Sequence, residues 1–337
     1  MKKIILMVAL ISLFVVSAFS LKVFMVTDVG GLGDKSFNDG TWAGIEEAAE
    51  YLGLETAFVQ SKEQADYIPN LSNAAKEGDI VFAVGFMMTD ALIDVAAQFP
   101  DTYFIGIDIE TTEVYNNIAT YLFKEQEGAF LVGYLAAAVT QSNKLGFVGG
   151  IAIPPVERFR YGYEAGIKTY EELNGKTIEL IKGYANDFND PKKGKDLAVA
   201  QFAEGADIVF HAAGTCGNGV IEAAQEKGAP YYAIGVDVDQ DYMAPGRVLT
   251  SSMKRVDVAA YDAVLSVALG TFEPGNHVLG IVEDGVGISP MTYTKDDVDP
   301  VVLEEIEILK NLVKEGTIII PDTQEALDAF IVPEIVF

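Results

Sequence analysis

The chain has 337 residues, half of them apolar, with 23 Lys and Arg against 50 Asp and Glu and a formal net charge of −27. This composition is sufficient for a large core and is not typical of a disordered protein. DNA, RNA and anionic lipid would repel so acidic a surface, so we expect no nucleic-acid partner.

Residues 1–20 predict a secretory signal peptide, because two lysines precede an apolar run that ends at Ala18 and Ser20, with the spacing of a cleavage site. No cysteine lies at this site, so the sequence offers no point for lipid attachment. The apolar stretch at 126–140 is too short to span a bilayer and predicts a buried core helix. We therefore expect an exported protein, periplasmic or associated with the cell envelope.

The segment "TDVGGLGDKSFNDGTWAGIEEA", residues 27–48, predicts a strand, a glycine-rich turn and a helix. It lacks the second glycine of a Walker A loop, and Ser36 replaces the third glycine of a dinucleotide fingerprint. Asp28 and Asp34 would also repel a pyrophosphate. The turn is therefore not a phosphate site.

The same turn places Asp28, Phe37 and Asn38 near the start of a helix. A carboxylate and an amide suit hydroxyl groups and ring nitrogens, and an exposed aromatic face suits a flat apolar ring. In the alternative interpretation, Asp34 or Ser36 caps the helix and Phe37 is core packing.

Two later segments, 79–108 and 207–237, resemble each other: each begins with Asp-Ile-Val-Phe and ends with Tyr-x-Ile-Gly-x-Asp. The similarity extends downstream to Lys124 and Lys254. Short β-branched runs alternate with helical patterns throughout the chain, which predicts two equivalent βαβ lobes with parallel sheets.

Ligands of parallel sheets bind at the carboxyl ends of the strands. Asp28, Asp108, Asp237 and Gly214 all fall at such ends. We therefore expect them to line one cleft, whose acidic groups favour a ligand rich in hydroxyl or N–H donors. Because the chain has one cysteine and two histidines, we expect no disulfide, no metal site and no cofactor.

These residues carry a resemblance. The segment 28–48, together with "GIDIE", "AAGTCGNGVIEAA", "IGVDVDQ" and "SSMKRVD", is similar to the basic membrane protein family, also called PnrA-like. The resemblance covers roughly residues 21–330. It implies a type I periplasmic-binding-protein fold, with two Rossmann-like lobes joined by three hinge crossovers. It also implies an exported protein that binds a purine nucleoside and delivers it to the permease of an ABC transporter.

The resemblance further implies roles for particular residues. Phe37 should stack on the base and Asn38 should hydrogen-bond it. Asp28, Asp108 or both should contact the ligand, while Asp237 and Lys254 should reach the ribose. The remaining implied contacts are backbone approach at Gly214 and a second stacking ring from Phe210, Phe159 or Phe188, of which Phe210 lies nearest a strand end.

We expect residues 21–121 and 251–279 to form lobe 1 and residues 122–250 and 280–337 to form lobe 2. The protein should act as a monomer and should not be an enzyme. Three alternatives stay open: a binding protein for a sugar or another small polar ligand, a nucleoside-cleaving enzyme, and a surface protein without a ligand.

Overall fold

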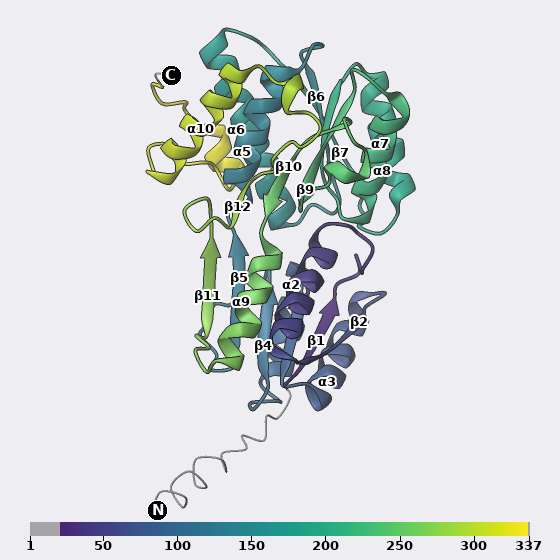
Figure 1. Cartoon of the computed structure of the whole chain (residues 1–337), viewed down its shortest axis with the longest axis vertical. Helices are drawn as coiled ribbons and strands as arrows, with labels where there is room; N and C mark the ends of the chain where they lie inside the picture. The colour runs from purple at the N-terminus through teal and green to yellow at the C-terminus, as the bar shows by residue number, and fades with distance from the viewer. Residues whose placement is uncertain (1–20, 336–337) are drawn as a thin grey trace, which may run out of the picture.

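The computed structural model describes residues 21–335, which form two lobes stacked along the long axis of the molecule (Figure 1). Each lobe contains a six-stranded sheet with helices on both of its faces. The predicted signal peptide, residues 1–20, lies outside the described residues.

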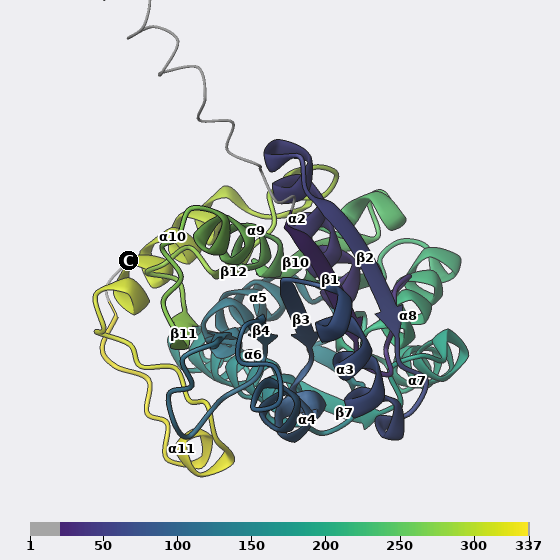
Figure 2. The same ribbon diagram turned by 90° about the horizontal axis from the view of Figure 1, so that it is seen from below.

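The sheet of lobe 1 is parallel throughout and has the strand order β11-β5-β4-β3-β1-β2. Its strands are β1 (Lys22–Thr27), β2 (Glu55–Gln60), β3 (Ile80–Val84), β4 (Tyr103–Ile107), β5 (Ile118–Phe123) and β11 (Gly275–Leu279). One face is covered by α2 (Phe37–Leu52) and α9 (Val256–Ala268), and the other by α3 (Tyr67–Glu77) and α4 (Thr89–Ala96), as Figure 2 shows.

The sheet of lobe 2 has the order β12-β10-β9-β8-β6-β7, and only the β10–β12 pair is antiparallel. Its strands are β6 (Lys144–Gly149), β7 (Glu179–Tyr184), β8 (Ile208–Ala212), β9 (Tyr232–Asp237), β10 (Val248–Lys254) and β12 (Val286–Ile288). Its helices are α5 (Glu125–Val139), α6 (Pro154–Asn174), α7 (Pro191–Ala203), α8 (Thr215–Lys227), α10 (Pro300–Lys314) and α11 (Gln324–Asp328). Short 3₁₀ turns occupy Gln64–Asp66, Phe86–Met88, Asp241–Met243 and Lys295–Asp297.

The two lobes repeat one arrangement, since β5-β4-β3-β1-β2 and β10-β9-β8-β6-β7 correspond position by position. The chain crosses between them after β5, after β10 and between β11 and β12. Backbone bonds from Lys124 to Leu279 and from Arg255 to Gly285 hold the crossings side by side. This architecture confirms the predicted type I fold. The predicted lobe divisions at 121/122 and 250/251 fall inside β5 and β10, so the strand pairing favours placing them after 123 and 254.

The central strands are continuous apolar runs because both faces of each sheet are covered. Every residue of β3 and β8 is buried, and β1 is buried after Lys22. Helix α5 is buried over most of its surface, as expected from the apolar run at 126–140. Among residues 21–335, no helix combines the length and the hydropathy needed to cross a bilayer.

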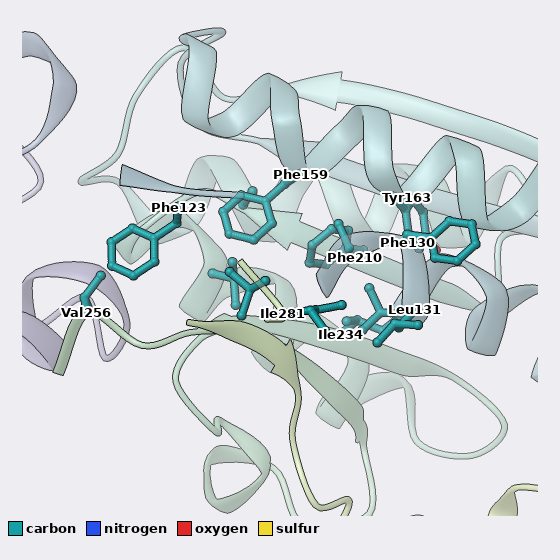
Figure 3. Packing of buried hydrophobic residues seen from close by; sticks show 14 of the residues in the cluster. Phe123, Phe130, Leu131, Phe159, Tyr163, Phe210, Ile234, Val256 and Ile281 are labelled. Atoms are coloured by element: carbon teal, nitrogen blue, oxygen red, sulfur yellow. The ribbon is translucent and has the colours of Figure 1, made fainter. Parts of the chain in front are cut away.

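Aromatic rings form the centre of the lobe 2 core. The ring of Phe210 lies 5.6, 6.1 and 5.0 Å, centroid to centroid, from Phe147, Phe159 and Tyr163. Figure 3 shows Phe159, Tyr163 and Phe210 in one row of buried side chains with Phe123, which lies beside the first crossing. The core thus continues from the hinge into lobe 2.

Helices α5 and α6 pack at backbone distance because glycines of α6 face the main chain of α5. A methyl group on Gly166 would lie 2.1 Å from the carbonyl oxygen of Phe130, which is closer than atoms can approach. Since backbone atoms cannot move aside as a side chain can, this contact fixes the separation of the two helices.

Gly166→Ala should therefore destabilise the protein despite the better helix propensity of alanine, by about 1–3 kcal/mol from overpacking. Urea unfolding measures this change in free energy. Gly287→Ala is the matched control, because a methyl group at Gly287 would meet no atom within 4 Å. Equal stabilities of the two variants would contradict the close packing of α5 on α6.

Candidate ligand site between the lobes

A cavity with about 560 Å³ of atom-free space, partly continuous with solvent, lies between the lobes. All the predicted site residues except Phe210 line it, namely Asp28, Phe37, Asn38, Asp108, Gly214, Asp237 and Lys254. Residues from the first and last thirds of the sequence thus meet in one place.

The three predicted aspartates reach the cavity from strand ends. Asp28 follows β1, Asp108 follows β4, and Asp237 ends β9. Asp108 and Asp237 adopt left-handed backbone conformations with φ of 60° and 64°. Aspartate tolerates this region better than most residues. The repeated Tyr-x-Ile-Gly-x-Asp motif therefore produces the same backbone turn in both lobes.

Asp34 organises the turn that enters α2. Its carboxylate accepts hydrogen bonds from the backbone N–H groups of Ser36, Asn38 and Asp39, at 3.0, 2.8 and 3.1 Å. It also lines the cavity. Ser36 is the N-cap residue of α2 but makes no side-chain cap bond, and the Asp34 carboxylate caps the first turn in its place, while Phe37 remains partly exposed and faces the cavity.

Asn38 is oriented by two carboxylates. Its Nδ2 donates to Asp28 Oδ1 and Asp34 Oδ2, both at 3.2 Å. Its Oδ1 is buried and has no hydrogen-bond partner. A buried polar atom without a partner is costly, so this oxygen is available to accept a hydrogen bond from a ligand.

Lys254 is the cation of the cavity, and its ammonium group is buried. Its Nζ contacts Asp108 Oδ2 at 2.5 Å and Glu125 Oε1 at 2.9 Å. The Glu125 carboxylate in turn accepts a hydrogen bond from Arg158 Nε at 2.6 Å. The ammonium also lies 5.0 Å from the centroid of the Phe37 ring, within cation–π range. Lys254 is therefore a buried, paired lysine and not a solvated one.

Glu125 and Arg158 were not predicted as part of the site. Glu125 begins α5 directly after the first crossing, and Arg158 lies in the second turn of α6. Nothing in the local sequence marks either residue, because the two helices are brought together only by the packing of lobe 2.

The cavity holds more carboxylates than cations can balance. Burial raises the pKa of Asp28 and Asp34 to about 6 and that of Asp237 to about 7. Burial also raises the pKa of Asp108, although Lys254 opposes this shift. For Glu125, burial acts in the same direction, but Lys254 and Arg158 outweigh it and lower the pKa.

The structure does not bring Phe210 to the cavity. Its side chain is fully buried in the core of lobe 2. The alternation of β8 directs it to the face of the sheet where it packs against Phe159 and Tyr163 of α6, and not into the cavity. Phe159 and Phe188 do line the cavity, as does Phe86, which was not predicted. Phe188 is partly exposed and lies beside Gly30 of lobe 1 and Gly214 of lobe 2.

The arrangement favours a neutral ligand with several donors and a flat apolar ring. Acceptor oxygens are available at Asp28, Asp108 Oδ1, Asp237 and Asn38 Oδ1. Lys254 adds little as a donor, because its ammonium already donates hydrogen bonds to two carboxylates. An anion would be repelled in so acidic a space. Within residues 21–335, no group of three or more His, Cys, Asp or Glu is placed to hold a metal ion.

Comparisons with known proteins identify the family of the chain. The family model described as ABC transporter substrate-binding protein PnrA-like matches residues 21–324. The CD4+ T-cell-stimulating antigen of Listeria monocytogenes is 34% identical over 89% of this chain and 88% of its own. An uncharacterised lipoprotein of Pyrococcus abyssi is 38% identical over 80% of this chain and 69% of its own.

A solved structure supports the same relationship. The crystal structure of an ABC transporter solute-binding protein from Aeropyrum pernix K1 has a TM-score of 0.84 and 31% sequence identity, covering 92% of this chain and 96% of that one. Relatives named as lipoproteins and solute-binding proteins suggest an exported protein.

The pKa shifts predict how stability depends on pH. The folded state holds the protons of Asp28, Asp34 and Asp237 more tightly than the unfolded chain does. The stability that these protonated side chains contribute is therefore fully present below the usual aspartate pKa and is lost as pH rises through about 6 to 7. Between pH 5 and pH 8, the free energy of unfolding of Asp237→Asn should fall by about 1–3 kcal/mol less than that of the wild type.

Urea unfolding of the ligand-free protein at both pH values measures this difference. Asp101→Asn, at an exposed position in lobe 1, should follow the wild-type profile. If Asp237→Asn and the wild type have parallel profiles, the Asp237 carboxylate is not destabilised in the folded state.

Proposed function

We propose that this chain, which belongs to the family of PnrA-like substrate-binding proteins of ABC transporters, captures a purine nucleoside in the cavity between its lobes. The ligand would be inosine, guanosine or adenosine. The observation that carries the proposal is an acceptor-rich cavity flanked by aromatic rings from both lobes. A nucleoside combines a flat ring with hydroxyl donors and carries no charge.

The base would lie against Phe37 of lobe 1. Phe188 is the better second ring, because its side chain is partly exposed and reaches across to Gly30, whereas Phe159 is almost fully buried. The edge of the base would then meet Asn38 Oδ1 and the Asp28 carboxylate, which accept hydrogen bonds from N–H groups.

The ribose would lie toward Asp108, Asp237 and Lys254. Hydrogen bonds from hydroxyls to carboxylates contribute about 1.5–3 kcal/mol each, and an aromatic pair adds about 0.5–1.5 kcal/mol beyond area burial. Two or three such bonds with stacking make a micromolar or lower Kd reasonable, since about −8.2 kcal/mol corresponds to 1 μM.

Binding would shift the protein further toward the closed arrangement of its lobes, because contacts from both lobes to the ligand are made only in that arrangement. A single closed copy would then present the nucleoside to the permease of an ABC transporter outside the cytoplasm. We propose no reaction on the ligand. A bare sugar would satisfy the carboxylates but would leave the aromatic faces uncovered, so we place it second.

Native mass spectrometry followed by calorimetric titration tests the proposal. Inosine, guanosine or adenosine should bind with a micromolar or lower Kd, whereas inosine 5′-monophosphate, ribose and glucose should bind more weakly. Binding of ribose or glucose, with no binding of any nucleoside, would overturn the assignment of the ligand. Release of free hypoxanthine from inosine would indicate an enzyme.

Single substitutions locate the contacts. Asp237→Asn should raise the Kd about 10- to 150-fold, the equivalent of one charge-assisted hydrogen bond. Phe188→Leu should raise it about 2- to 10-fold through lost stacking, and more than Phe159→Leu does. Phe58→Leu in the edge strand β2 of lobe 1 is the matched control, because Phe58 is exposed and does not line the cavity.

A further inference from the structure

Two backbone carbonyls of lobe 1 accept hydrogen bonds from side-chain amides of lobe 2. Gln240 Nε2 donates to the Lys35 carbonyl at 3.0 Å, and Asn218 Nδ2 donates to the Gly33 carbonyl at 3.2 Å. Gln240 follows β9, and Asn218 lies in the first turn of α8. Neither side chain lines the cavity, so these bonds join the lobes without touching a ligand.

The acceptor loop of lobe 1 is held rigidly in its own lobe. The Asp39 carboxylate accepts the N–H of Gly33 at 2.8 Å and the N–H of Lys35 at 2.9 Å, one with each oxygen. Gly33 and Lys35 have positive φ values of 97° and 54°. The same two residues thus give their N–H groups to α2 and turn their carbonyls toward lobe 2.

The Gln240 donor is equally fixed. The residue is fully buried, its Oε1 accepts the Val236 N–H at 2.9 Å, and its own N–H donates to Ser251 Oγ at 3.1 Å. Gly235 leaves room for the amide, since a methyl group there would lie 2.7 Å from Oε1. Only the Nε2 group of Gln240 is directed at the other lobe.

We propose that Gln240 and Asn218 form a latch that holds the two lobes closed and so sets how long a ligand stays bound. They are positioning residues: they act on closure and through it on the ligand. Any opening that separates residues 33–35 from lobe 2 must break both bonds, whereas the bonds within each lobe persist. The inference rests on the proposed function only for the choice of ligand.

Two substitutions of Gln240, by Leu and by Glu, distinguish loss of the latch from a general loss of stability. Gln240→Leu removes the donor and should raise the dissociation rate of inosine about 3- to 10-fold with little change in the association rate, as one net hydrogen bond implies. Asn218→Ala should raise it about 2- to 5-fold for the same reason. Gln225→Leu, at an exposed position of α8, is the control and should match the wild type.

Gln240→Glu supplies a signature that a general loss of packing would not. At pH 8 one oxygen of its carboxylate can still accept the Val236 N–H. The other oxygen lies against the Lys35 carbonyl, and because both atoms are acceptors the hydrogen bond between the lobes is lost. Because position 240 is fully buried, desolvation should raise the pKa of this acid, and once protonated at pH 5.5 it can donate to that carbonyl, so its dissociation rate should approach the wild-type rate. Gln240→Leu should show no such recovery. The imidazole of His211 interacts with the side chain of residue 240, and Asp34, Asp39, Asp239 and Asp241 are also present in every variant, so only ratios to wild type at the same pH are compared.

Stopped-flow dissociation gives these rates, and small-angle X-ray scattering of the ligand-free proteins gives their radii of gyration. The latch predicts a larger radius for Gln240→Leu and Asn218→Ala than for the wild type. Wild-type rates and radii in both variants would overturn it. If no nucleoside binds the wild type, the proposed function fails but the scattering comparison still decides the latch. If Gln240→Leu does not fold, Asn218→Ala decides it.

Discussion

The buried ammonium of Lys254 allows carboxylates of both lobes to share one small space. It contacts Asp108 of lobe 1 and Glu125 at the first crossing, and it lies near Asp237 of lobe 2. Burying such charges is expensive unless they are paired and hydrogen-bonded. Arg158 completes the network by pairing with Glu125. The charge of Lys254 is largely used within the protein, which leaves Asp28, Asp237 and one oxygen of Asp108 for a ligand.

The duplicated architecture explains why these groups converge. Five strands of each sheet follow the same order, and Asp108 directly after β4 and Asp237 at the end of β9 have the same left-handed backbone conformation. When two such sheets are joined by three adjacent crossings, the ends of their strands face each other across the hinge. An acidic cavity is then a consequence of the repeat, and the aromatic rings at Phe37 and Phe188 provide it with apolar walls.

Much of this could be predicted from sequence because it depends on local patterns. Apolar runs that end in aspartate identify parallel strand ends, and the Tyr-x-Ile-Gly-x-Asp repeat identifies the equivalent lobes. Phe210 was assigned wrongly to the cavity side because the face of a strand depends on how its register meets the helices above it. Glu125, Arg158 and Gln240 were missed since their partners are 33 to 205 residues away along the chain. Such contacts leave no local pattern.

The proposed binding mode requires ionised carboxylates in the cavity to accept hydrogen bonds from the ligand. The most direct test is calorimetry of inosine binding at pH 6.5 in two buffers that differ in their ionisation enthalpy. Because burial raises the pKa of Asp28 and Asp237 into this range, ligand donors should lower these pKa values again. Binding should therefore release protons. Proton uptake, or an enthalpy independent of the buffer, would contradict it.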